Sequence, residues 1–188
     1  MMKKILIALA VVFAAVVPSA AQDGTAVLSV IEKKLSSSKG FSGPFSEVRN
    51  APKKETVSLK GEICYRNEDY IDMSYTNGEL FNVDGNAMTI IRDGKTQKFD
   101  LNKNLMMKSL SHTLLFVFQG RLEALAQEQN ADIEAAVEGK EYVVTLTARK
   151  KAARGCSKVM VRYRTADCGI VSMRLEEFGG NTTFYSMD

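Results

Sequence analysis

The sequence predicts an α+β fold that is mainly antiparallel β: a strongly curved, incomplete β-barrel of about ten strands, with helices covering its concave face. Short segments in which apolar and polar residues alternate occupy most of the chain, and two stretches instead have helical spacing. Three turn signals, Asn77-Gly78, Asp84-Gly85 and Asp93-Gly94, separate neighbouring alternating segments as in consecutive hairpins. Because each strand has one apolar face, so many strands must close on themselves or be covered.

The composition is that of one folded domain behind a removable leader. The chain has 188 residues, of which 45% are hydrophobic and 25% charged, so disorder is excluded. Lys3 and Lys4 precede an apolar run at residues 5–17, and small residues follow at 18–21. That run is too short to cross a bilayer comfortably, which favours a secretory signal peptide at residues 1–21. We therefore expect a single domain at residues 22–188, exported to a periplasm.

Charge excludes nucleic acid as a partner. The chain has 25 basic and 22 acidic residues, and two of the basic ones leave with the signal peptide, so the mature chain is nearly neutral. Nucleic-acid binding needs a concentrated positive surface. One basic cluster remains at residues 149–154. We interpret it as a solvated loop between strands, with an acidic partner or lipid headgroups as the functional alternative.

The first part of the mature chain changes from helical to strand periodicity. Asp23 is a candidate N-cap for a helix of about four turns that stops at Gly40. Its apolar residues Val27, Leu28, Ile31 and Leu35 have helical spacing. After it we expect about six strands. The alternating segments among them lie at residues 57–65, 71–75, 79–83, 86–92 and 95–100.

A helical insertion interrupts the strands. Between residues 105 and 127 the only helix breaker is Gly120, and the segment 114–118 is apolar all round. Residues 131–137, ending at Gly139, could be helical or irregular. About four strands follow: one at 142–146, two around a turn at 165–169, and one at 182–187. Because Cys168 lies in that turn and Cys156 nine residues before it, the two should not be bonded to each other. A bond between Cys64 and Cys156 stays open.

The case for an enzyme is weak. None of the usual nucleophile, zinc, phosphate or dinucleotide motifs is present. His112 is the only histidine, and a lone histidine cannot build a metal site. The carboxylates of Asp69 and Asp72, or of Glu176 and Glu177, are more simply explained as solvent-exposed strand residues. We expect no cofactor and no metal, and a thiol-dependent enzyme using Cys64 remains a rival reading.

The remaining signal is an excess of apolar surface. Several methionines fall on or beside the inward faces, and methionine suits a cavity for variable apolar ligands, although it also fills gaps in ordinary cores. An apolar concave sheet with a hydrophobic helical lid could hold acyl chains, with the lid moving aside on loading. The methionines concerned are Met73, Met88, Met106, Met107 and Met173. The candidate cavity and lid residues are Leu59, Ile63, Tyr65, Ile71, Met73, Tyr75, Phe81, Val83, Met88, Ile90, Leu110, Leu114 and Phe118.

Three blocks of sequence resemble one family. They are Gly61-Glu62-Ile63-Cys64-Tyr65-Arg66-Asn67-Glu68-Asp69-Tyr70, then Leu80-Phe81-Asn82-Val83-Asp84-Gly85, and a C-terminal block, residues 167–185, containing Gly180-Asn181-Thr182-Thr183. Together they resemble the LolA-like periplasmic carriers of outer-membrane lipoproteins. The resemblance implies a monomeric, non-enzymatic carrier that binds lipoprotein acyl chains or related lipids. It also implies an inner-membrane lipoprotein-release ABC complex as donor and an outer-membrane acceptor.

The resemblance has two departures. Family members can carry a functional arginine in the turn after the strand that starts near Gly61, tied to lid movement. That position falls on Asn67 here, with Arg66 one residue early, so Arg66 is a candidate lid latch or an ordinary surface arginine. The chain also lacks tryptophan. The rival from another class is an envelope sensor or protein-interaction module on the same fold, without lipid transport.

Overall fold

A computed structural model describes residues 23–38, 40–66, 69–150 and 155–187 of the chain. The predicted signal peptide lies outside these residues, as does most of the basic cluster at 149–154. The three helices are α1 (Gly24–Ser36), α2 (Leu105–Gln119) and α3 (Leu122–Gln129). The strands before α2 are β1 (Gly40–Asn50), β2 (Val57–Arg66), β3 (Tyr70–Tyr75), β4 (Leu80–Asp84), β5 (Ala87–Arg92) and β6 (Lys95–Asp100). Those after α3 are β7 (Ala131–Glu138), β8 (Glu141–Ala148), β9 (Cys156–Arg164), β10 (Ile170–Glu177) and β11 (Thr182–Met187).

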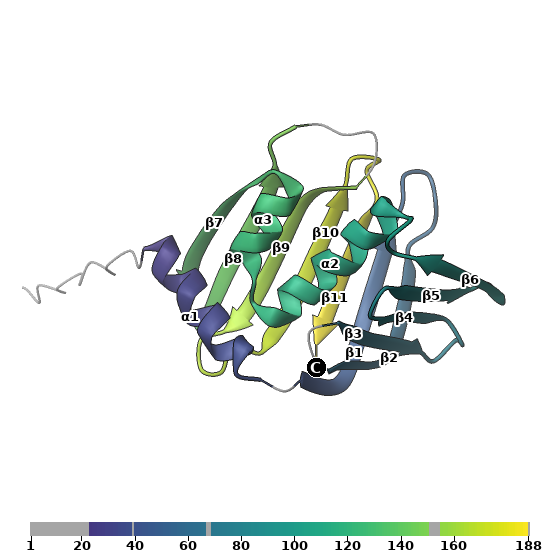
Figure 1. Ribbon diagram of the computed structural model, residues 1–188, viewed down its shortest axis with the longest axis horizontal. Helices are drawn as coiled ribbons and strands as arrows, with labels where there is room; N and C mark the ends of the chain where they lie inside the picture. Colours follow the sequence, from purple (N-terminus) through teal and green to yellow (C-terminus); the bar gives the residue numbers. More distant parts are fainter. Residues whose placement is uncertain (1–22, 39, 67–68, 151–154, 188) are drawn as a thin grey trace, which may run out of the picture.

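All the strands form one antiparallel sheet that does not close. Their order is β6-β5-β4-β3-β2-β1-β11-β10-β9-β8-β7, which leaves β6 and β7 at the edges. Figure 1 shows β3 to β6 running across the direction of β7 to β10, with the longer β1 and β2 between the two halves. The predicted curved, incomplete barrel is confirmed, with 11 strands where about ten were expected.

The helices begin and end at residues that the sequence marks. The Asp23 side chain accepts a hydrogen bond from the Thr25 N–H at 3.2 Å, which starts α1 as predicted. The Asn104 side chain accepts one from the Met107 N–H at 3.1 Å and starts α2. Gly120 then ends α2 with φ at 71°, a left-handed conformation that favours glycine. The expected helical stretch 105–127 is therefore two helices.

The three helices cover the inner face of the sheet, and the core lies between these layers. In Figure 1, α2 and α3 pass in front of the strands and α1 lies beside β7. The buried side of α1 consists of Val27, Leu28 and Ile31. Within the core, the Tyr163 hydroxyl on β9 donates a hydrogen bond to the Val117 carbonyl oxygen at 2.9 Å, which fixes the end of α2 to the sheet.

Two segments differ from expectation. Residues 40–50 form β1, which the sequence pattern did not indicate because Gly40, Gly43 and Pro44 interrupt the alternation. Residues 131–137, read as helical or irregular, belong to β7. This segment is rich in alanine and glutamate, which are good helix formers, but pairing along the whole of β8 and packing of α1 and α3 override that preference.

The remaining turn and cysteine predictions hold. The turns at 77–78, 84–85 and 93–94 separate β3 to β6, and the residues 165–169 join β9 to β10. Cys64, Cys156 and Cys168 are all free, so the open pairing of Cys64 with Cys156 is not formed. Among the helices within the described residues, none is long and apolar enough to cross a membrane.

Candidate ligand-binding site

The register of β2 to β5 brings most of the predicted cavity residues together. Ile63, Met73, Phe81 and Ile90 lie opposite one another in one row across the four strands. Tyr65, Ile71, Val83 and Met88 form a second row beside it. Successive rows point to the same side because side chains alternate along a strand. The sequence pattern therefore identified one continuous apolar surface on the inner face.

That surface is covered by the helices. Five of these eight residues, together with Leu114 and Phe118 of α2, are at most 3% exposed; Tyr65 is 6% and Tyr75 8% exposed. Leu59, Phe81 and Ile90 are half-buried and pack against the same core. Leu110 is half-buried on α2, outside the core cluster. Of the methionines, Met106 is 44% exposed, so its expected inward position is wrong.

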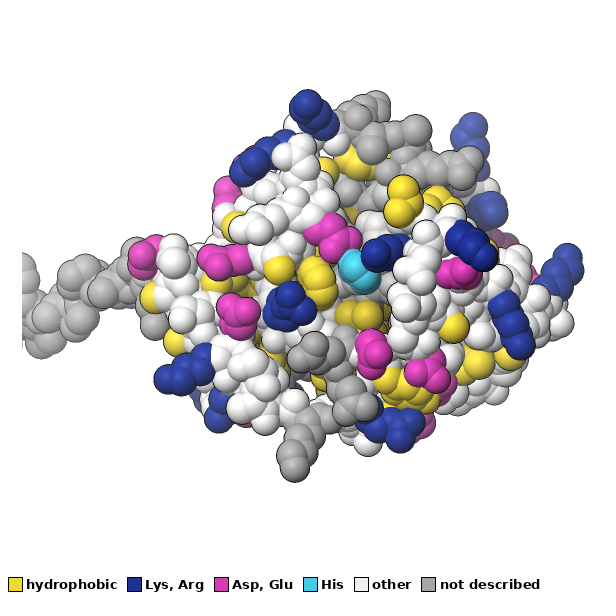
Figure 2. Space-filling model, viewed as in Figure 1, with side chains coloured by type: hydrophobic (Ala, Val, Ile, Leu, Met, Phe, Trp, Pro, Cys, Tyr) yellow, Lys and Arg dark blue, Asp and Glu magenta, His cyan; other side chains and the backbone are white. Residues whose placement is uncertain are grey.

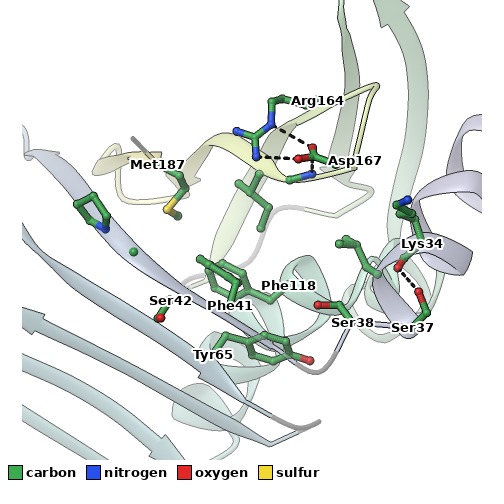
Figure 3. A pocket seen from close by; sticks show the side chains of 15 residues that line it. Lys34, Ser37, Ser38, Phe41, Ser42, Tyr65, Phe118, Arg164, Asp167 and Met187 are labelled. Atoms are coloured by element: carbon green, nitrogen blue, oxygen red, sulfur yellow. Dashed lines mark hydrogen bonds and ion pairs between the residues drawn. The ribbon is translucent and has the colours of Figure 1, made fainter.

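An open pocket lies at one end of the inner face. It has a volume of about 550 Å³, inside the range of small-molecule sites. Of the predicted cavity residues, only Tyr65 and Phe118 line it. The others come from the end of α1, the start of β1, the β9–β10 turn and the end of β11 (Figure 3). They are Lys34, Leu35, Ser37, Ser38, Phe41, Ser42, Gly43, Pro44, Arg164, Asp167, Gly169, Ile170 and Met187.

Three aromatic rings form the apolar floor of this pocket. Phe118 of α2 lies 5.1 Å from Phe41 of β1 and 5.6 Å from Tyr65 of β2, between ring centroids. Phe41 is 38% exposed although it points to the inner side, because the helices leave it uncovered. The cluster joins the end of α2 to the sheet at the pocket. Sequence reasoning missed Phe41 because it missed β1.

Charged and hydroxyl groups surround the floor. Figure 3 shows Arg164 and Asp167 on one side of the aromatic rings and Lys34, Ser37 and Ser38 on another. Arg164 donates hydrogen bonds to Asp167 from Nε at 3.0 Å and from Nη2 at 3.2 Å. These bonds, with one from the Gly169 N–H, hold the pKa of Asp167 below its usual range. The Asp167 carboxyl group therefore stays ionised at neutral pH.

Arg66 lies elsewhere. It is exposed at the end of β2, and its guanidinium lies 4.4 Å from the centroid of the Tyr70 ring. That contact joins two strands, and it involves neither a helix nor the pocket. The lid-latch role of Arg66 stays a prediction without support in these contacts. The contact that does fix α2 to the sheet is the one from Tyr163 to Val117.

A buried ionic network lies toward the other end of β1. Glu47 is 2% exposed on the inner face, and Arg49 donates to it from Nε at 2.5 Å and to Glu79 from Nη1 at 2.6 Å. Burial, followed by the negative charge of Glu47, raises the pKa of Tyr75. The Tyr75 hydroxyl therefore keeps its proton. The sequence pattern gave no warning of this network, because Glu47 and Arg49 belong to the strand that was not expected.

The groups considered for catalysis have structural partners. His112 Nδ1 lies 2.8 Å from Glu128, which links α2 to α3. The Asn82 side chain donates to Asp72 at 3.0 Å, and Arg174 pairs with Glu176 at 2.9 Å. Cys64, the thiol considered for catalysis, is half-buried and free. Burial raises the pKa of a different thiol, Cys156, to about 11, which disfavours its reactive thiolate. The described residues contain no group of three or more His, Cys, Asp or Glu side chains that could hold a metal.

No protein-family model matches the chain, and no curated protein matches it. Among solved structures, a LolA superfamily protein from Nitrosomonas europaea has 9% identity over 88% of this chain and 91% of its own, with a TM-score of 0.39. A putative outer membrane lipoprotein-sorting protein domain from Vibrio parahaemolyticus has 10% identity over 86% and 88%, with a TM-score of 0.39. A chain of the MucA/MucB complex of Pseudomonas aeruginosa is similar at 15% identity over 88% of this chain and 56% of its own, with a TM-score of 0.41.

Solved structures similar to this chain include proteins named as LolA superfamily members and as lipoprotein-sorting domains. All three TM-scores are below 0.5, so the similarities say nothing about what this chain binds. The function is argued below from the pocket and the covered apolar face.

Proposed function

We propose that the chain is a periplasmic carrier that binds an acyl chain of a lipoprotein, or of a related lipid, between the curved sheet and its helices. The observation that carries the proposal is the pocket itself. Its floor of Phe41, Tyr65 and Phe118 is continuous with the two apolar rows on the inner face through Tyr65. An acyl chain entering there would extend under α2 once that helix shifts. No covalent chemistry is needed, because burial of apolar surface supplies the binding energy.

The available energy is sufficient. Hiding roughly 400 Å² of acyl surface at about 25 cal/mol per Å² contributes on the order of 10 kcal/mol before the costs of ordering. Displacing α2 costs part of this binding free energy, because its residues Leu114 and Phe118 are themselves buried against the sheet. That exchange would let the cargo leave again. In this proposal the donor is an inner-membrane release complex and the acceptor lies in the outer membrane.

Binding of an acyl probe to pocket variants tests the proposal. Phe41→Asp and Phe118→Asp should each weaken binding of a fluorescent fatty acid by about tenfold or more, because a charge enters the apolar floor. Phe41→Asp is the safer of the two, because Phe41 is already 38% exposed and its replacement disturbs the core less. Leu114→Asp should likewise weaken binding or prevent the lid from closing.

The matched control is Phe184→Asp. Phe184 is 40% exposed on the outer face of β11 and does not line the pocket. This variant should bind the probe as the natural chain does. If the pocket variants fold and bind the probe normally, the assignment of pocket and lid is wrong. If the natural chain binds no acyl probe at all, the protein-interaction module becomes the better reading.

A further inference from the structure

The pocket opens where the sheet has a gap. β11 pairs with β1 only from Phe45 to Asn50, and with β10 from Ser172 to Glu176. Beyond Met187, the first half of β1 and the β9–β10 turn face each other without a strand between them in the described part of the chain. The end of α1 closes a third side. The pocket therefore has an apolar floor inside the molecule and a mouth at its surface.

The mouth has an excess of positive charge. Of its lining residues, Lys34 and Arg164 are basic and Asp167 is the only acidic one. The carbonyl oxygens of Lys33 and Lys34 at the end of α1 accept hydrogen bonds from the hydroxyls of Ser36 and Ser37, at 3.1 Å and 2.7 Å. These bonds offset the negative end of the helix dipole. The exposed ammonium of Lys34 is thus left as the charge that α1 presents to the mouth.

Arg164 is held in place before any ligand arrives. The Asp167 carboxylate accepts hydrogen bonds from Nε and Nη2 of Arg164. It also accepts one from the Gly169 N–H at 2.9 Å, which fixes its own position. The Nη1 group takes part in none of these bonds. Gly169 allows this arrangement, because a Cβ there would come within 2.2 Å of Arg164 Nη2. A fixed guanidinium loses little side-chain entropy when it binds a carboxylate or phosphate.

We propose that this mouth binds the anionic headgroup of the lipid, so that the cargo is an amphiphile with a carboxylate or phosphate next to its acyl chain. The inference rests on the proposed carrier function and adds the chemical class of the cargo. Lys34 and Arg164 contact the headgroup, Ser37 and Ser38 lie within the same rim, and the chain lies on the aromatic floor. A neutral lipid of equal chain length gains only the apolar part of this binding, and a zwitterionic phosphocholine gains less than an anionic lipid because its choline cation offsets the charge of its phosphate.

Titration calorimetry with ligands that share one chain tests this, below their micelle concentrations. The probes are dodecyl phosphate, dodecylphosphocholine and inorganic phosphate. We expect dodecyl phosphate to bind about tenfold tighter than dodecylphosphocholine at low salt, with a smaller ratio at about 0.5 M salt. The double variant Lys34→Gln, Arg164→Gln should bring the ratio close to one, because it weakens dodecyl phosphate much more than dodecylphosphocholine.

Two further variants make the result specific. Lys33→Gln removes a neighbouring charge of α1 that does not line the pocket, and should leave the ratio unchanged. Gly169→Ala displaces the Arg164 side chain without changing any charge, and should lower the ratio in part. This second variant keeps the test valid if the double variant folds poorly.

Each outcome separates the two proposals. Equal binding of both lipids by the natural chain overturns the headgroup inference and leaves the carrier function standing. Binding of neither lipid overturns both. Inorganic phosphate that binds as tightly as dodecyl phosphate would show a site for free anions, which also overturns the inference. An anionic preference that survives the double variant would place the headgroup elsewhere.

Discussion

Glu47 is a buried carboxylate inside an otherwise apolar inner face. Its charge is tolerated because Arg49 binds it and also binds Glu79. Removing one partner of a buried ion pair leaves the other charge desolvated. This residue could not be predicted from the sequence, because alternation within β1 was hidden by its glycines and proline. Glu79, the other carboxylate that Arg49 binds, was read only as the start of a strand.

Replacing Glu47 should be strongly destabilising. Glu47→Gln keeps the side-chain shape but leaves Arg49 with a single carboxylate partner, and should lower the free energy of unfolding by about 3 kcal/mol. Urea denaturation at neutral pH measures this. Glu176→Gln, which breaks the more exposed pair with Arg174, is the control and should change stability by less than about 1 kcal/mol. Equal effects of the two variants would contradict the structural importance of the buried network.

Tyr163 joins α2 to the sheet through a buried hydrogen bond. Its hydroxyl is fully buried, and burial raises its pKa well above the usual value, so it remains a donor to Val117. Tyr163→Phe should lower stability by about 1–2 kcal/mol, because a buried carbonyl oxygen loses its partner. If α2 must move for loading, the same variant should take up an acyl probe faster in stopped-flow measurements.

The matched control for this variant is Tyr142→Phe. Tyr142 lies opposite Tyr163 on β8. Unlike the Tyr163 hydroxyl, which donates to Val117, the Tyr142 hydroxyl makes no hydrogen bond to another of the described residues. It should change neither stability nor uptake appreciably. A Tyr163→Phe variant with unchanged uptake but lower stability would mean that opening of α2 does not limit loading.

Among the secondary-structure elements, the break between α2 and α3 depends on one glycine, Gly120. Gly120 has φ at 71°, and a Cβ there would come within 3.1 Å of Ile31 and Leu35 of α1. Gly120→Ala should therefore be destabilising both through the strained backbone and through lost packing, by about 2–3 kcal/mol. Thermal or urea unfolding checks it.

Gly139 offers the comparison that separates these two causes. It has φ at 61° in the β7–β8 turn, and nothing lies within 4 Å of a Cβ placed there. Gly139→Ala should lower stability by about 1 kcal/mol, from backbone strain alone. If both variants lose the same stability, the contact of α1 with the α2–α3 junction contributes nothing, contrary to this account.

Elements were predictable where local chemistry and tertiary structure agree. The hairpins from β3 to β6 followed from Asx-Gly turns, and α1 from its cap and apolar spacing. β7 was missed because alanine and glutamate favour a helix, although β7 pairs with β8 across a two-residue turn at residues 139–140 and packs against the distant α1. β1 was missed because Pro44 and two glycines conceal its alternation, and because one of its two neighbours, β11, lies far along the chain.

The candidate site could likewise be predicted from the sequence only where its residues lie in elements with a clear local pattern. Two of the residues that line the pocket, Tyr65 and Phe118, were predicted, because both lie in strongly patterned elements. The rest lie at the ends of four elements that meet only in the folded chain. Alternation shows which face of a strand is apolar, but not which part of that face the helices leave open. The sequence therefore predicted the covered surface better than the opening.

For the whole molecule, the core between the helices and the sheet supplies stability, while the pocket lies apart from it, at one end of the inner face. The helices bury the inner face, as a core does, while the gap beside β11 leaves one entrance. Figure 2 shows that the helix-covered side presents hydrophobic side chains in small groups between charged ones, with no single broad apolar patch. Such a surface gives the protein little apolar area on this side through which copies could associate.

Native mass spectrometry of the protein, purified gently from the periplasm and followed by solvent extraction, tests the central claim most directly. The account predicts bound species that carry acyl chains, with anionic headgroups enriched among them, and their loss in the Phe41→Asp variant. A mass corresponding to the empty chain, together with failure to bind an added acyl probe, would contradict the carrier function while leaving the fold unchanged.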